Sequence, residues 1–161
     1  MRKLPILVLA SLLAITAMSP MVMADEIGFG VDVDKYITAT FNYAAVDFGN
    51  LAANTTDTAA LSVNNNVSVD TNYPYYVAAS GTKFEGGSYE FAISNLKMMV
   101  ASVFEDLVVG SATALGADPV NLEAATNGAT SFHGFWLSIP AAQGGGAYTS
   151  TVTITYGSAT V

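Results

Sequence analysis

"IGFGVDVDKYITATFNY", residues 27–43, decides the fold class because its apolar side chains keep to one parity. The odd positions carry Ile27, Phe29, Val31, Val33, Ile37, Ala39, Phe41 and Tyr43, with Lys35 as the one lapse. The even positions are mostly Gly, Asp, Thr and Asn. Alternation of this kind indicates a β-strand with one buried face. At about 3.3 Å per residue the stretch would reach roughly 56 Å, whereas strands usually run about 17–20 Å, so the extra length needs an explanation.

The residues before this stretch have the order of a secretory signal peptide. Arg2 and Lys3 precede an apolar run over residues 4–17, a break follows at Ser19-Pro20, and the small residue Ala24 stands at the expected cleavage point. This order predicts a signal peptide over residues 1–24 and one mature domain over residues 25–161. The apolar run is short for a membrane span, and no later segment has about 18 consecutive apolar residues. We therefore expect a secreted or cell-surface chain with no stable membrane span in its mature part; a retained anchor is the alternative.

Composition limits the classes of partner. The chain has no cysteine, which excludes disulfides and thiolate metal sites and leaves burial to stabilise the domain. Residues 25–161 contain three lysines, no arginine and all thirteen acidic residues, a net charge of 3 minus 13, or −10. A surface of that sign repels phosphates. The sequence therefore predicts no nucleic-acid binding.

Further strand signals follow the opening stretch. They lie at residues 61–70, in "YYVAAS" from Tyr75, at residues 88–93, in "FHGFWLSIP" from Phe132, and in a last strand from Tyr148 to Tyr156. Residues 96–110 fit either period, with a strand pair favoured over a short helix, and residues 110–131 are predicted to be a loop with one helical turn. We expect seven to nine short strands in an all-β, antiparallel β-sandwich of the immunoglobulin-like or jelly-roll kind.

Residues that could support catalysis are few. His133 is the single histidine, and no serine has a nucleophile-elbow glycine pattern around it. Acidic residues at positions 25, 26, 32, 34, 105, 106 and 118 could ligate calcium, but no segment has the EF-hand order. A solvated strand face accounts for the Asp32 and Asp34 pair. We expect no enzyme activity and no cofactor, with calcium as the one metal to consider.

Two other kinds of site can be read from the sequence. Exposed aromatic side chains could form a sugar-binding platform, for which Tyr75, Tyr76 and Trp136 are the candidates, with Tyr73 beside them. Core packing is the simpler explanation for most of them. The sequons at Asn54 and Asn66 would accept N-linked glycan where the organism has that machinery.

Three interpretations compete for the long first strand. A hairpin could turn at Asp34-Lys35, or a single strand could bend and cross between the two sheets. In the third interpretation Ile27, Phe29, Val31 and Val33 form an assembly strand that fills a gap in a neighbour's sheet, while residues 37–43 begin the home sandwich. Such a contact is head-to-tail and does not close, so it propagates into a fibre.

Three quoted motifs carry a family resemblance. "AAVDFGNLAANT" after the first strand, "FWLSIP", and the closing "GGGAYTSTVTITYG" resemble secreted pilin-like and spore-coat-like immunoglobulin-fold surface domains of prokaryotes. The resemblance covers about half of the mature chain. It implies an immunoglobulin-like fold and a structural or adhesive role, in some members with donor-strand polymerisation. The end also resembles bacterial surface domains with a Trp-x-Leu signature, but Tyr156-Gly157-Ser158 departs from it.

The sequence as a whole predicts an exported cell-surface structural protein. We expect a filament or surface-layer subunit that associates with itself or with other surface proteins by N-terminal strand addition. The first alternative is a monomeric adhesion or carbohydrate-binding module. The second is a small secreted hydrolase built on His133 and a carboxylate.

Overall fold

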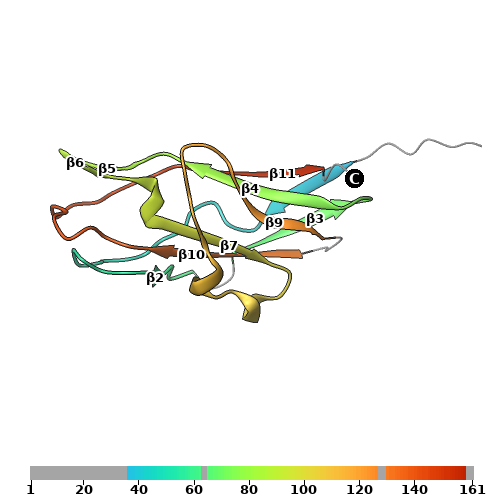
Figure 1. Cartoon of the computed structure of the whole chain (residues 1–161), viewed down its shortest axis with the longest axis horizontal. Coiled ribbons are helices and arrows are strands. Elements are labelled where there is room, and N and C mark those ends of the chain that lie inside the picture. The colour runs from blue at the N-terminus through green and yellow to red at the C-terminus, as the bar shows by residue number, and fades with distance from the viewer. Residues whose placement is uncertain (1–35, 63–64, 127–129, 159–161) are drawn as a thin grey trace, which may run out of the picture. The chain divides into compact units, whose positions relative to one another are not determined.

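The computed structural model describes residues 36–62, 65–126 and 130–158, which form an all-β unit (Figure 1). The chain divides into residues 1–33 and 34–161, and every described residue belongs to the second part. The predicted signal peptide and assembly strand therefore lie outside the described residues. No helix within the described ranges has the length and apolar character that crossing a membrane requires.

Eleven strands are present among the described residues, and nine of them, all except β2 and β8, have three residues or more. They are β1 (Ile37–Phe41), β2 (Thr58–Ala59), β3 (Asn66–Thr71), β4 (Tyr75–Gly81), β5 (Phe84–Gly86), β6 (Tyr89–Phe91), β7 (Leu96–Ala101), β8 (Thr113–Ala114), β9 (Val120–Thr126), β10 (Thr130–Leu137) and β11 (Val152–Ser158). Short 3-10 turns occur at η1 (Ile93–Asn95), η2 (Phe104–Asp106) and η3 (Val109–Ser111).

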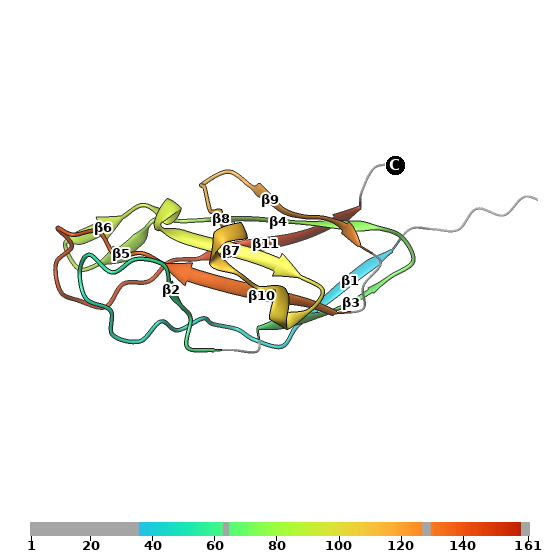
Figure 2. The same ribbon diagram turned by 60° about the horizontal axis from the view of Figure 1, so that its bottom comes forward.

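The strands form two facing antiparallel sheets and a small hairpin, which is a β-sandwich (Figure 2). The first sheet has the order β1-β3-β10-β7-β8, and β2 pairs with the end of β10. The second sheet has the order β11-β4-β9. Strands β5 and β6 form the hairpin, which a bridge between Glu85 and Thr149 joins to the segment before β11. The predicted fold class is confirmed.

Alternating side chains from both sheets fill the core between them. The first sheet contributes Val67 and Val69 from β3, Met98 and Val100 from β7, and Phe135 and Leu137 from β10. The second sheet contributes Tyr75, Val77 and Ala79 from β4, and the half-buried Val152, Ile154 and Tyr156 from β11. Because the side-chain period of a strand is two, the intervening residues face outward, as the exposed threonines of β11 do.

The strand order matches most of an immunoglobulin domain. In that domain strands A-B-E-D face strands C-F-G, and the chain visits them alphabetically. Here β1, β3, β10 and β7 take the places of A, B, E and D, while β4 and β11 take those of C and F. Strand β9 lies on the far side of β4, so no strand among the described residues is hydrogen-bonded to β11 where G would be.

The local predictions had mixed outcomes. The strands from Tyr75, through "FHGFW" and at the end of the chain are confirmed, and β7 confirms a strand at the start of residues 96–110. The loop predicted over residues 110–131 is wrong, because β8 and β9 lie within it. Backbone pairing of β9 with β4, through two register shifts, overrides the helical preference of Glu and Ala there. The first strand, where described, ends at Phe41.

Gly134 explains how the one tryptophan is buried on β10. A Cβ at this position would lie 2.8 Å from Cζ3 of Trp136 and closer still to Cη2, because the indole covers the glycine backbone. Trp136 is 9% exposed in consequence. The absence of a side chain at Gly134 is therefore required by the packing of its neighbour.

Gly134→Val is expected to lower the free energy of unfolding by about 1–3 kcal/mol, the usual cost of overpacking. Urea denaturation measures the difference. Gly145→Ala is the matched control, since a Cβ there meets no atom within 4 Å. Equal stability of the two variants would contradict the packing described for Trp136.

Candidate functional site

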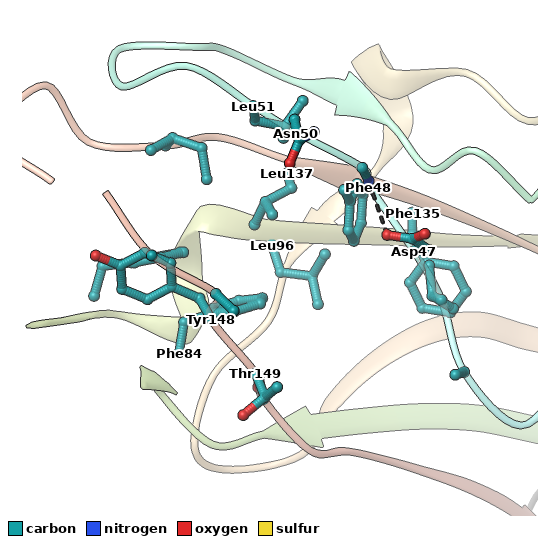
Figure 3. A pocket seen from close by; sticks show the side chains of 18 of the residues that line it. Asp47, Phe48, Asn50, Leu51, Phe84, Leu96, Phe135, Leu137, Tyr148 and Thr149 are labelled. Atoms are coloured by element: carbon teal, nitrogen blue, oxygen red, sulfur yellow. Dashed lines mark hydrogen bonds between the residues drawn. The ribbon is translucent and has the colours of Figure 1, made fainter. Parts of the chain in front are cut away.

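An apolar groove of about 760 Å³ opens between two segments that lie far apart in the sequence. Its first lip is residues 43–53, after β1, and its second lip is residues 143–154, leading into β11. Its floor consists of buried core side chains, namely Phe84, Phe91, Leu96, Phe135 and Leu137. Figure 3 shows Phe48 of the first lip and Leu96 and Leu137 of the floor pointing into the same space. The groove thus reaches the hydrophobic core directly.

The first lip is fixed at its two ends and belongs to no strand. Before it, the Asn42 N–H donates to the Asn66 carbonyl at 3.1 Å, which extends the pairing of β1 with β3. After it, the Asp57 carboxylate accepts from Lys97 at 2.8 Å and from the Ser138 hydroxyl at 3.2 Å. The Lys97 hydrogen bond is the main cause that lowers the pKa of Asp57. Val46, Phe48 and Leu51, between these anchors, pack half-buried against the core.

The second lip presents backbone hydrogen-bonding groups to the groove. The Thr82 N–H donates to the Thr151 carbonyl, so these two residues form a hydrogen-bonded antiparallel pair. Antiparallel ladders alternate, so Val152 and Ile154, which face Gly81 and Ala79, occupy the non-hydrogen-bonded positions. Their N–H and C=O groups point away from β4, toward the groove. Because β11 is an edge strand among the described residues, this side of it has the pairing capacity of an open sheet edge.

The groove ends where three side chains join the two lips. His133 of β10 is hydrogen-bonded through Nδ1 to the Tyr43 hydroxyl at 2.5 Å and through Nε2 to the Tyr156 hydroxyl at 2.8 Å. We call this set the Tyr-His-Tyr bridge. A neutral imidazole has one donor and one acceptor nitrogen, so one tyrosine donates to the ring and the other accepts from it. The bridge therefore connects the first lip to β11 across the face of β10.

Aromatic side chains pack around the bridge and bury the His133 ring. Phe41 makes edge contacts with Tyr43, His133 and Tyr156 at centroid distances of 5.7, 6.1 and 6.1 Å. His133 is 2% exposed, and burial lowers its pKa from 6.5 to about 4. Burial likewise raises the pKa of Tyr156 to about 12 and that of Tyr43 further. All three groups are consequently neutral around pH 7.

The predicted sugar-binding aromatics do not form a platform. Tyr75 is 2% exposed and packs in the core against Tyr156, and Trp136 lies against Gly134. Only Tyr76 of the three is exposed, at 37%. The prediction of exposed Tyr75 and Trp136 is wrong: Tyr75 has the inward parity of β4 and lies in the core, whereas Trp136, on the other face of β10 from Phe135, is covered by packing over Gly134.

The other predicted sites lie apart from the groove or outside the described residues. Asn54 is exposed in a turn with φ of 64°, while Asn66 is a half-buried residue of β3. Glu105, Asp106 and Asp118 are exposed, and the described residues contain no group of three or more potential metal ligands. Ile27, Phe29, Val31 and Val33 belong to the part that is not described.

His133 does not sit in the arrangement that the hydrolase interpretation requires. Both ring nitrogens are hydrogen-bonded to tyrosines, whereas a catalytic triad needs a serine on one side and a carboxylate on the other. The sequence shows only that the single histidine, His133, lies within a predicted strand. Tyr43 and Tyr156 share the inward parity of their strands, but only the sheet topology shows that they meet at His133.

Comparison with known proteins gives no match, whether with protein-family models, curated proteins or solved structures.

Acid is expected to weaken the fold through His133. The unfolded imidazole binds a proton near pH 6.5 and the folded one only near pH 4, so its contribution is complete above about pH 6.5 and is lost as the pH falls toward about 4. At 1.36 kcal/mol per pKa unit the loss is about 3 kcal/mol. Urea denaturation between about pH 7 and 4 measures it.

His133→Gln is the control for the carboxylates that titrate in the same range. It keeps a donor and an acceptor but cannot take up a proton there. We expect the variant to lose about 3 kcal/mol less than the parent chain over this range. An identical pH profile of the two proteins would contradict a neutral buried His133.

Proposed function

We propose that this chain is an exported cell-surface structural protein whose copies assemble by strand addition. In this proposal residues 27–33 of one copy occupy the groove of the next copy. The observation that carries it is the edge of β11, where backbone groups point into an apolar groove with no strand beside them in the described part of the chain. A strand in the groove would satisfy that edge and cover the core side chains of the floor.

The alternation of residues 27–33 suits this groove. An added strand has one face toward the floor and the other toward solvent, so it needs apolar side chains at every second position. Ile27, Phe29, Val31 and Val33 supply that face, and Gly28, Gly30 and Asp32 supply the other. Each buried side chain of this size contributes about 1.5–3 kcal/mol of transfer free energy, so the four supply about 6–12 kcal/mol. Ordering seven residues costs about 7–14 kcal/mol of backbone entropy, so the main-chain hydrogen bonds to β11 must supply the rest.

Chain length favours a second copy as the source of the strand. The pairing of β1 with β3 continues from Ile37 to Asn42, about 17 Å along the strand, and the groove begins beyond it at Tyr43. Val33 is four residues before Ile37 and reaches at most about 14 Å from it. A segment folded back on its own body could therefore bring only its first residues into the groove.

The closed end of the groove sets the direction of the incoming strand. Residue 36 begins the body of the donor molecule, so Val33 must lie at the end of the acceptor groove away from the bridge. Ile27 then points toward Tyr43 and Tyr156. Because β11 runs toward Tyr156, the incoming strand is antiparallel to β11. The resulting contact is head-to-tail and extends into a filament.

Substitution of the apolar donor face tests the assembly. We expect Phe29→Asp combined with Val31→Asp to leave the protein monomeric, because both carboxylates would have to enter an apolar groove. Negative-stain electron microscopy and sedimentation of the purified exported protein measure the outcome, with filaments expected only in the parent chain.

Gly28→Ser combined with Asp32→Asn is the matched control, since it changes only the outward parity. We expect this variant to form filaments as the parent does. Filaments in the Phe29→Asp, Val31→Asp variant, or in none of the three proteins, would overturn the proposal.

A further inference from the structure

The floor of the groove continues along one face of β10 until it meets the Tyr-His-Tyr bridge. Leu137, Phe135 and His133 are successive inward side chains of β10. The first two line the groove, whereas the third lies beyond the last lining residues, Tyr43 on one lip and Ile154 on the other. His133 therefore stands at the position where the next apolar side chain of an incoming strand would otherwise rest.

The bridge joins the two lips just beyond the last residues that line the groove. Tyr43 comes from the first lip and Tyr156 from β11, and the His133 ring stacks on Tyr156 with a centroid distance of 6.2 Å and an interplanar angle of 21°. The Phe41 ring of β1 also makes an edge contact with the Tyr156 ring of β11. Two hydrogen bonds to one buried ring fix the two tyrosines relative to each other.

A wall at one end of the groove would fix the register of the incoming strand. A slip of one residue would turn the apolar face of the strand outward, so alternation excludes it. A slip of two residues keeps the apolar face inward, and four consecutive odd positions with apolar side chains make such slips nearly equivalent. Neither the alternation nor the uniform apolar floor distinguishes these registers. Only a feature at one end of the groove can do so.

We propose that His133 is a positioning residue, which holds Tyr43 and Tyr156 as an end wall and thereby fixes the register of the incoming strand. This inference rests on the proposed function. With the wall at Tyr156, Ile27 is the last apolar side chain inside the groove and lies opposite Ile154, Phe29 lies opposite Val152, and the charged Asp25 and Glu26 pass outside the wall. The outward residue Gly30 then lies opposite Thr151. A strand that slipped two residues deeper would bring Gly30 opposite Thr153 instead.

Disulfide trapping reads this register directly because the chain has no cysteine. The acceptor is the full chain with Phe29→Asp and Val31→Asp, which keeps its groove but cannot donate. It also carries one of Thr149→Cys, Thr151→Cys or Thr153→Cys, three exposed positions on the outward face of the second lip. The probe is a peptide of residues 25–35 with Gly30→Cys. Directly opposed residues have Cα atoms about 4.5–5.5 Å apart, within the range of a disulfide.

With His133 in place, we expect the peptide to link mainly to the cysteine at position 151. In the His133→Leu acceptor, which retains a side chain without hydrogen-bonding groups, the ratio of links at 153 to links at 151 is expected to rise at least about fivefold, the lower limit that corresponds to loss of both hydrogen bonds of the bridge. His133→Gln can donate and accept as the neutral imidazole does, so we expect it to restore the original ratio.

Leu115→Ala controls for general loss of stability, because Leu115 is 1% exposed yet neither lines the groove nor belongs to the bridge. We expect it to leave the ratio unchanged. If His133→Leu does not fold, Tyr43→Phe with Tyr156→Phe in one chain keeps both rings, removes both hydrogen bonds, and is expected to give the same shift. An unchanged ratio in whichever bridge variant folds, or the same shift in Leu115→Ala, would overturn the role of His133.

The outcomes separate this inference from the proposed function. Absence of links at all three positions in the acceptor with His133 intact would overturn strand addition itself. Links with an unchanged ratio in the bridge variants would leave strand addition standing and reject only the end wall.

Discussion

The open edge of β11 is the constraint on which the rest of the structure depends. An edge strand normally faces water, is short, or carries charges that discourage pairing. Here the N–H and C=O groups of Val152 and Ile154 point into an apolar groove whose floor is the core of the sandwich. A backbone group buried there without a partner costs about 1–3 kcal/mol. A strand supplied from elsewhere would remove that cost and bury the lips of the groove as well.

The open edge of β11 is also consistent with the composition of the chain. With no cysteine, the domain has no disulfide to stabilise it, so an edge of β11 with no paired strand among the described residues matters more to its stability. The outward faces compensate for the exposed edge in the free molecule: β11 carries threonines, and the chain has a net charge of −8. Like charges keep separate copies soluble, while apolar burial in the groove acts only at short range.

The sequence predicts the sandwich well because strand periodicity is a local signal. Val67 and Val69, Phe135 and Leu137, and the threonine row of β11 alternate visibly, and each lies on the face that its parity indicates. The loop predicted over residues 110–131 is wrong because β9 takes its form from pairing with β4, which leaves a weak local pattern. The prediction that Tyr75 and Trp136 are exposed is wrong because residue type alone does not distinguish a buried aromatic ring from one in a sugar-binding surface. The groove and the Tyr-His-Tyr bridge depend on contacts between residues about 90 positions apart, so no local pattern could reveal them.

Hydrogen exchange of the β11 amides in the full-length protein tests the open edge most directly. The N–H groups of Thr153 and Thr155 point toward β4 and serve as internal references, whereas those of Val152 and Ile154 point toward the groove. If this edge of β11 is open, the amides of Thr153 and Thr155 exchange slowly in both the monomer and the assembly. The amides of Val152 and Ile154 then exchange slowly only in the assembly. Equal protection of all four amides in the monomer would contradict it, because the edge would then already be paired within one molecule.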